Sequence, residues 1–156
     1  MRRGLPLLSV LLLVASAAQA GPQPLESFDA LMDALRGGHT VRVVAEYGRC
    51  ELISDNEPDE APDATGGMTI DAWEWFAKGS VFNDQAFVVF SHGSLIEHPR
   101  RGMATNHVKF KVYEDGKVVI SARYLDPVTY EETMFEKLFT TIARGDEGAA
   151  HFYRID

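Results

Sequence analysis

The C-terminal half of the chain consists of strand-patterned segments joined by short turns, and this limits the possible folds more than any other feature. The segments are residues 86–90, 106–113, 117–125, 134–142 and 150–155. Short connections join antiparallel neighbours, because a parallel pair needs a crossover of a dozen or more residues. The pattern therefore predicts an antiparallel meander.

The hairpin formed by residues 106–113 and 117–125 has a register that the sequence specifies. A two-residue turn would place apolar side chains opposite polar ones, and a slip of one residue moves every side chain to the other face. A three-residue turn with Gly116 in the left-handed conformation instead gives apolar pairs: Val112 with Val118, Phe110 with Ile120 and Val108 with Ala122. We predict the three-residue turn.

The opposite face of this hairpin then carries five basic residues: His107, Lys109, Lys111, Lys117 and Arg123. On an acidic chain, such a cluster creates a local positive field. We interpret this basic face as a candidate docking surface for an anionic partner, either an acidic protein or a polysaccharide. The alternative is a solvated strand face whose lysines discourage pairing with other chains.

The N-terminal half is predicted to contain two helices, one strand and one loop. Ser27 is a cap for the first helix, which presents Phe28, Leu31, Met32 and Leu35 on one face and ends at Gly37-Gly38. Residues 39–47 alternate as a strand does. Residues 51–63 form an acidic loop with two prolines, and a short second helix with Ile70, Trp73 and Phe76 on one side ends at Gly79.

Residues 1–20 have the parts of a secretory signal peptide in the usual order. Two arginines precede an apolar run of about a dozen residues, and Ala18-Gln19-Ala20 is a small-x-small cleavage site. The apolar run is too short to span a bilayer as a helix. We expect export to the periplasm or the exterior, cleavage after Ala20, and one domain over residues 21–156 without a membrane anchor.

Charge and cysteine content narrow the classes of function. Without Arg2 and Arg3, 13 basic residues face 23 acidic ones, a formal charge of −10. Nucleic-acid binding is therefore not expected, because it depends on cationic side chains that displace counterions. Cys50 is the single cysteine, so the fold depends on its apolar core, and we expect a buried, free thiol.

Three motifs suggest chemistry, and none meets the requirements of its class. Asp55, Glu57 and Asp59 match the first ligands of a calcium loop, but the glycine and the terminal acid of that loop are absent. His92 and His98 lack the spacing of zinc ligands. Ser91 and His92 are adjacent on a strand and point to opposite faces, so they are not a nucleophile and its base. We expect no catalytic residues, no metal site and no cofactor.

Several stretches, taken in order, resemble the VirK family of small exported bacterial proteins. They are Ser27-Phe28-Asp29-Ala30-Leu31, residues 41–47 leading to Cys50, Gly66-Gly67, residues 70–76, Phe90-Ser91, Asn106-His107-Val108, Glu114-Asp115-Gly116 and residues 124–130. The resemblance implies an exported protein with a role in virulence or host interaction, and it supplies no catalytic residues. Many members carry a second cysteine in the penultimate strand, where this chain has Thr140.

The sequence as a whole predicts an α+β domain. An antiparallel sheet of five to seven strands, flat or curled toward a barrel, packs against the N-terminal helix and the second short helix. The function that fits best is a non-enzymatic binding or accessory protein. A hydrolase with an unrecognised active site and a carrier of a small apolar ligand remain open alternatives, as does the oligomeric state.

Overall fold

The computed structural model describes residues 21–54 and 57–156, and these form two antiparallel sheets and one α-helix. The elements in chain order are β1 (Gln23–Pro24), α1 (Phe28–Arg36), β2 (Val41–Glu46), the 3-10 turn η1 (Tyr47–Arg49), β3 (Glu51–Ser54), β4 (Glu57–Asp59), β5 (Thr65–Thr69), β6 (Glu74–Phe76), β7 (Phe87–His98), β8 (Gly102–Tyr113), β9 (Lys117–Leu125), β10 (Glu132–Thr141) and β11 (Ala150–Arg154).

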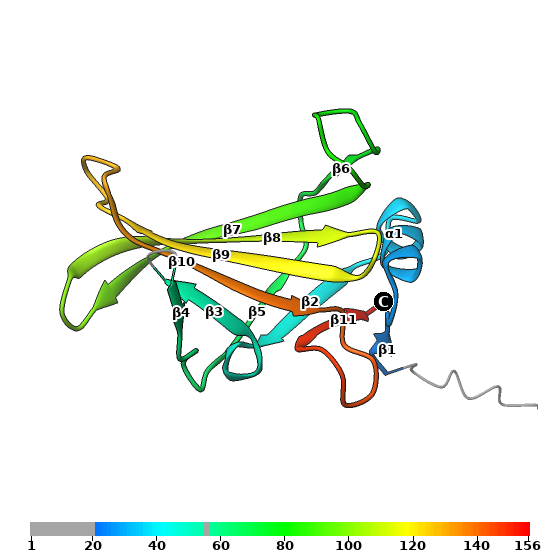
Figure 1. Ribbon diagram of the computed structural model, residues 1–156, viewed down its shortest axis with the longest axis horizontal. Helices are drawn as coiled ribbons and strands as arrows, with labels where there is room; N and C mark the ends of the chain where they lie inside the picture. The colour runs from blue at the N-terminus through cyan, green and yellow to red at the C-terminus, as the bar shows by residue number, and fades with distance from the viewer. Residues whose placement is uncertain (1–20, 55–56) are drawn as a thin grey trace, which may run out of the picture.

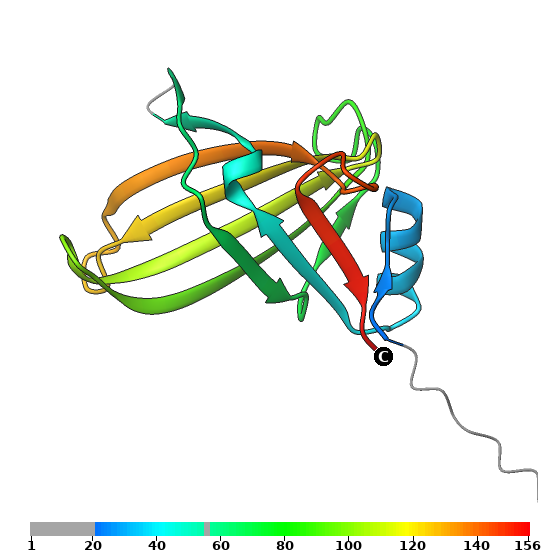
Figure 2. The same cartoon turned by 90° about the horizontal axis from the view of Figure 1, so that it is seen from below.

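The two sheets pack face to face. The larger sheet has seven strands in the order β4-β3-β10-β9-β8-β7-β6, and the smaller has four in the order β1-β11-β2-β5. The long strands β7 to β10 form the body of the molecule (Figure 1). Seen from below, the smaller sheet crosses under these strands, and α1 stands at one end beside β1 and β11 (Figure 2).

The core lies between the sheets and is entirely apolar. Phe90 of β7 stacks on Phe110 of β8 with 5.2 Å between ring centroids. Phe152 of β11 meets the same Phe90 ring edge-on at 6.3 Å, so aromatic contact links the two sheets. Helix α1 adds Leu31, which is fully buried. Burial on this scale is the main favourable term that holds the two sheets together.

Helix α1 forms where the sequence predicts it. The Ser27 side chain accepts a hydrogen bond from the Ala30 backbone N–H at 3.1 Å, which satisfies one of the free amides of the first turn. The helix ends at Gly37, and Gly38 follows with φ of +75°, a conformation that glycine adopts without strain.

The predicted register of the central hairpin is confirmed. Val112 pairs with Val118, and Gly116 closes the turn with φ of +87°. The expectation of an antiparallel meander is also confirmed, since β7, β8, β9 and β10 pair in sequence order.

Two predictions for the N-terminal half are wrong. The second short helix does not form: residues 74–76 are strand β6, which pairs with β7. The acidic segment 51–63 is not simply a loop, because β3 adds to β10 and β4 pairs with β3. Asp55 of the calcium-like motif lies outside the described residues.

The domain is consequently mostly β rather than α+β, with one short helix. The barrel option is wrong as well, because the strands are divided between two open sheets that do not close. The long sheet has seven strands, at the upper end of the predicted range. Residues 1–20 lie outside the described residues, and in the remainder no helix is long and apolar enough to cross a membrane.

Candidate functional site on the outer face of the large sheet

The seven-stranded sheet has one face against the core and one toward solvent, which we call the outer face. Side chains alternate between the two along each strand. Because Val112 and Ile120 are fully buried, their odd-numbered neighbours in β8 and β9 point outward. All five residues of the predicted basic face therefore lie on the outer face.

The strand register places these five cations in two groups. His107 lies opposite Arg123, Lys109 opposite Ser121 and Lys111 opposite Val119. Lys117 starts β9 at the other end of the hairpin from Arg123 and lies opposite Thr141 of β10. His107, Lys109 and Lys111 form a column along β8, and Arg123 lies beside the His107 end of this column. Their role in binding remains a prediction.

Aromatic rings of the outer face pack against two of these basic side chains, and these rings were not part of the predicted basic face. The Lys111 ammonium is 3.8 Å from the ring centroid of Phe87 and 4.8 Å from that of Tyr113. The Arg123 guanidinium is 4.6 Å from the centroid of Phe135. Such contacts contribute about 0.5–1 kcal/mol each at exposed positions. They hold the cationic side chains against the sheet.

Lys137 of β10 is a sixth basic residue on this face, and it was not among the predicted residues. It lies opposite Ser121, which itself lies opposite Lys109, so the three residues form one row across the sheet. Its ammonium is 5.3 Å from the Phe135 ring centroid. The buried neighbour Leu138 is the signal that could have identified it, because the alternation of β10 then directs residue 137 outward.

Two of the six cations have acidic partners. Lys117 forms an ion pair with Asp115 at 2.9 Å, and Arg123 lies 3.5 Å from Glu132. Burial tends to raise the pKa of Asp115, but hydrogen bonds from Lys117 and Gln85 outweigh it and hold that pKa below its usual range. Within residues 21–54 and 57–156, no carboxylate lies within ion-pair distance of His107, Lys109, Lys111 or Lys137.

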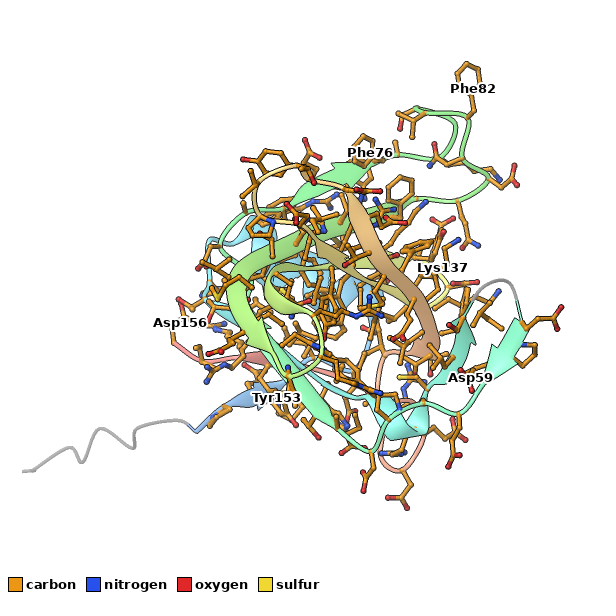
Figure 3. All side chains as sticks on the ribbon, turned by 90° about the vertical axis from the view of Figure 1, so that its left-hand side faces the viewer. Asp59, Phe76, Phe82, Lys137, Tyr153 and Asp156 are labelled. Carbon is orange, nitrogen blue, oxygen red and sulfur yellow. The ribbon has the colours of Figure 1, made fainter. Side chains whose placement is uncertain are left out.

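A groove of about 690 Å³ adjoins the basic face where the β8–β9 turn meets the loop before β7. Lys111 and Lys117 line it together with apolar side chains from Tyr113, Val119 and Phe139, and the loop contributes Phe82. Phe82 is fully exposed, with φ of +60°. Figure 3 shows it at the tip of the loop, clear of the rest of the molecule.

Hydrogen bonds from Asn83 give this loop a defined shape. Its amide nitrogen donates to the carbonyls of Ala77 at 2.9 Å and Gln85 at 2.8 Å, and its side-chain oxygen accepts from the Val81 N–H at 3.0 Å. A single side chain thus ties the two ends of the loop together and supports the wall of the groove.

Cys50 is half-buried, and partial burial raises the pKa of its thiol, an effect that a hydrogen bond with Thr140 opposes. A thiol of raised pKa is a poor nucleophile. In the part of the chain that the structure describes, no three His, Cys, Asp or Glu side chains converge to hold a metal ion. The Trp75 ring packs against Arg36, whose guanidinium carbon is 4.8 Å from the ring centroid.

The fold and this surface together define a class: a small domain of two packed antiparallel sheets with one helix and a cationic, aromatic sheet face. A family model described as VirK protein matches residues 24–130. That is more than half of the chain, so the protein belongs to the VirK family.

A solved structure supports the same fold. The crystal structure of a VirK family protein from Legionella pneumophila superposes with a TM-score of 0.65 at 16% sequence identity. The match covers 83% of this chain and 98% of that one. No curated protein matches the sequence.

Proposed function

We propose that the protein is an exported, non-enzymatic binding protein that docks an acidic segment of a partner protein on its outer face. The observation that supports this most directly is the column His107, Lys109 and Lys111, which the register of β8 and β9 places on one solvent-facing surface. The column belongs to a domain of formal charge −10, so the local charge on this surface is opposite in sign to the net charge of the domain.

The spacing of the column favours an extended polypeptide as the partner. Alternate residues of a strand lie about 6.6–6.8 Å apart along its axis. Acidic side chains at alternate positions of an extended segment have the same spacing, so each carboxylate can meet one cation of the column. Arg123 and Lys137 broaden the column into a surface that also contacts the neighbouring positions of the segment.

The energetics fit a docking surface better than a structural role. Lys109 and Lys137 are exposed and have no acidic partner among the described residues. Their charges therefore contribute little to folding, and remain available to a ligand. Complementary charges mainly raise the association rate, and their effect weakens as salt screens it.

Binding of a defined probe tests this proposal. The probe is a fluorescein-labelled peptide in which Glu and Thr alternate, titrated by fluorescence anisotropy at low and high salt. We expect salt-sensitive binding to the wild type, and a loss of at least about tenfold in affinity for the Lys109→Glu, Lys111→Glu, Lys117→Glu variant.

A matched control carries the same charge change elsewhere: Arg42→Glu, Lys78→Glu, Arg100→Glu. These three residues are exposed, and none belongs to a strand of the larger sheet: Arg42 is in β2 of the smaller sheet, and Lys78 and Arg100 lie in turns. The control should retain most of the affinity, because only total charge has changed. Equal loss in both variants would show that net charge alone attracts the probe. Preference for polygalacturonate over the peptide would assign the face to a polysaccharide instead.

The groove beside the basic face favours a second function, the carriage of a small ligand. Its apolar walls from Tyr113, Val119 and Phe139 would hold the body of the ligand, and Lys111 and Lys117 would bind an acidic group. Native mass spectrometry of protein isolated from its own compartment separates the two functions, because a carrier would retain a bound mass of small-molecule size. No observation on the described residues favours the hydrolase alternative.

A further inference from the structure

Strand β7 has a free edge along most of its length. Strand β6 pairs with β7 at Phe87, Val88 and Val89 only, whereas β8 pairs with β7 from Phe87 to His98. Beyond Val89, β7 therefore has a neighbour on one side. Figure 1 shows the short β6 beside one end of the long β7. Among residues 21–54 and 57–156, no other strand covers this stretch.

The hydrogen-bonding groups on this edge can be assigned from the register. The Glu114 N–H donates to the Ala86 carbonyl at 3.0 Å, so residues 86 and 114 face each other across the β7–β8 pair. Antiparallel strands alternate between residues that bond to one neighbour and residues that bond to the other. The odd-numbered residues Ser91, Gly93, Leu95 and Glu97 consequently direct their N–H and C=O groups toward the free edge.

The same stretch borders the cationic column of β8. Ser91 lies opposite Lys109 and Gly93 opposite His107. Ser91 has a short side chain and Gly93 has none, so these two residues do not block the path from the free edge to Lys109 and His107. A hollow of about 400 Å³ lies here, lined by Ser91, His107 and Lys109 together with Glu74 at the start of β6 and Trp73 just before it.

We propose that the acidic segment of the partner adds to β7 as an extra antiparallel strand, in the line that β6 leaves empty. This inference rests on the proposed function and specifies how the partner binds. The backbone of the added strand bonds to the odd-numbered residues of β7. Its outward acidic side chains cross over Ser91 and Gly93 and reach Lys109 and His107.

The distances are compatible with this arrangement. Neighbouring strands lie about 4.7–4.9 Å apart, so the added strand lies roughly twice that distance from β8. A lysine and a glutamate side chain, each extended toward the other over a glycine or serine, span that separation. Glu74 and Glu97 occupy the two ends of the edge, so the acidic residues of the partner must be concentrated at the centre, opposite Ser91 and Gly93.

Strand addition uses main-chain hydrogen bonds for affinity and side-chain contacts for specificity. The long uncovered edge is otherwise a liability, because unpaired edges recruit other chains. A partner strand on this edge would pair with β7 along its uncovered stretch. The acidic side chains of the partner would meet basic residues only on the outer face of the sheet.

N-methylated versions of the Glu-Thr peptide test this inference without altering the protein. In the proposed register, the glutamates lie opposite odd-numbered residues, and their N–H groups point toward β7. N-methylation of the glutamates blocks these bonds and keeps the charge, so affinity should fall at least about tenfold. N-methylation of the threonines affects the outer edge of the added strand and should leave the affinity nearly unchanged.

Two further measurements locate the contact. Amide hydrogen exchange of Ser91, Gly93, Leu95 and Glu97 should slow when the unmodified peptide binds. Leu95→Pro, which removes one outward N–H, should weaken binding more than Leu95→Ala, which removes only the exposed side chain. Because Leu95 does not bond to β8 through its N–H, both variants should keep the fold.

The outcomes separate this inference from the proposed function. If the unmodified peptide fails to bind, or binds the triple glutamate variant as well as the wild type, the proposed function fails. If that binding holds but both N-methylated peptides bind equally well, strand addition alone is overturned. Sedimentation showing that the protein alone is a dimer, which Leu95→Pro dissociates, would also overturn it, because a second copy of the chain would then occupy the edge.

Discussion

Cys50 lies where a second cysteine, introduced on the neighbouring strand β10, could form a disulfide with it. Phe139 of β10 lies opposite Glu51 of β3, so the next residues along, Thr140 and Cys50, face each other across the same pair of strands. The Thr140 hydroxyl contacts the Cys50 thiol closely enough to affect the pKa of the thiol. Directly opposed residues have Cβ atoms about 4.5–5.5 Å apart, near the separation that a disulfide needs.

Thr140→Cys should therefore form a disulfide with Cys50 under oxidising conditions. The bond would close a long loop, and we expect the free energy of unfolding to rise by about 2–4 kcal/mol. Non-reducing mass spectrometry would detect the loss of two hydrogens, and denaturant unfolding with and without reductant would give the stability. Thr141→Cys is the control, because residue 141 points to the outer face and its thiol should stay free. A reduced Thr140→Cys protein under the same conditions would contradict the placement of these strands.

At the scale of elements, the connection between β9 and β10 depends on one carboxylate. Asp126 accepts hydrogen bonds from the backbone N–H groups of Val128 at 2.8 Å and Thr129 at 2.7 Å. These bonds stabilise the charged form and hold the pKa of Asp126 below its usual range. They also fix a turn that exposes Val128 and Tyr130, the latter with φ of +60°.

The stabilisation from Asp126 should depend on pH. Because the folded-state pKa is lowered, the contribution is present above the unfolded-state pKa of about 3.9 and is lost as the pH falls through the folded-state value. Asp126→Asn should therefore be less stable than the wild type at pH 7, and the difference should shrink in acid. Thermal unfolding of both proteins across this range gives the answer. A constant difference at every pH would mean that the charge of Asp126 is irrelevant.

The elements show where sequence information is sufficient and where it is not. The turn and register of the β8–β9 hairpin were predictable to the residue, because its strands are neighbours in sequence and Gly116 specifies the turn. The start of β8 was not, since the strand begins at Gly102 rather than at residue 106. The second helix was wrong because Ile70, Trp73 and Phe76 have helical spacing by coincidence. Ile70 packs in the core, whereas Phe76 stacks on Phe87 across the β6–β7 pair, with 4.9 Å between ring centroids.

Long-range pairing accounts for most of what the sequence did not reveal. Strand β4 is Glu57-Pro58-Asp59 and is fully exposed, so neither hydrophobicity nor alternation marks it as a strand. It exists because β3 offers an edge. The cationic residues of the hairpin were found from local register. Lys137 and Phe135 were not, because only the pairing of β10 with β9 brings these two residues beside the basic residues of the hairpin.

At the scale of the whole molecule, the first described strand lies close to the predicted cleavage site. Gln23 pairs with Arg154 in the first strand, which leaves Gly21 and Pro22 between Ala20 and the start of regular structure. We expect the exported protein to begin at Gly21. N-terminal sequencing of protein from the periplasm or culture medium checks this. Recovery of chains that retain Met1 in the membrane fraction would contradict the export part of the proposed function.

The position of β11 has a consequence for how the molecule is made. This strand lies between β1 and β2 in the smaller sheet, yet most of the chain separates it from both in sequence. When the chain becomes available from its N-terminus to its C-terminus, β1 and β2 therefore cannot pair with their shared neighbour until residues 150–154 are present. Contacts between distant segments slow folding, so we expect the smaller sheet to be completed late. For the export that we propose, this order of assembly would matter, because the smaller sheet could not be completed until the C-terminal end of the chain had crossed the membrane.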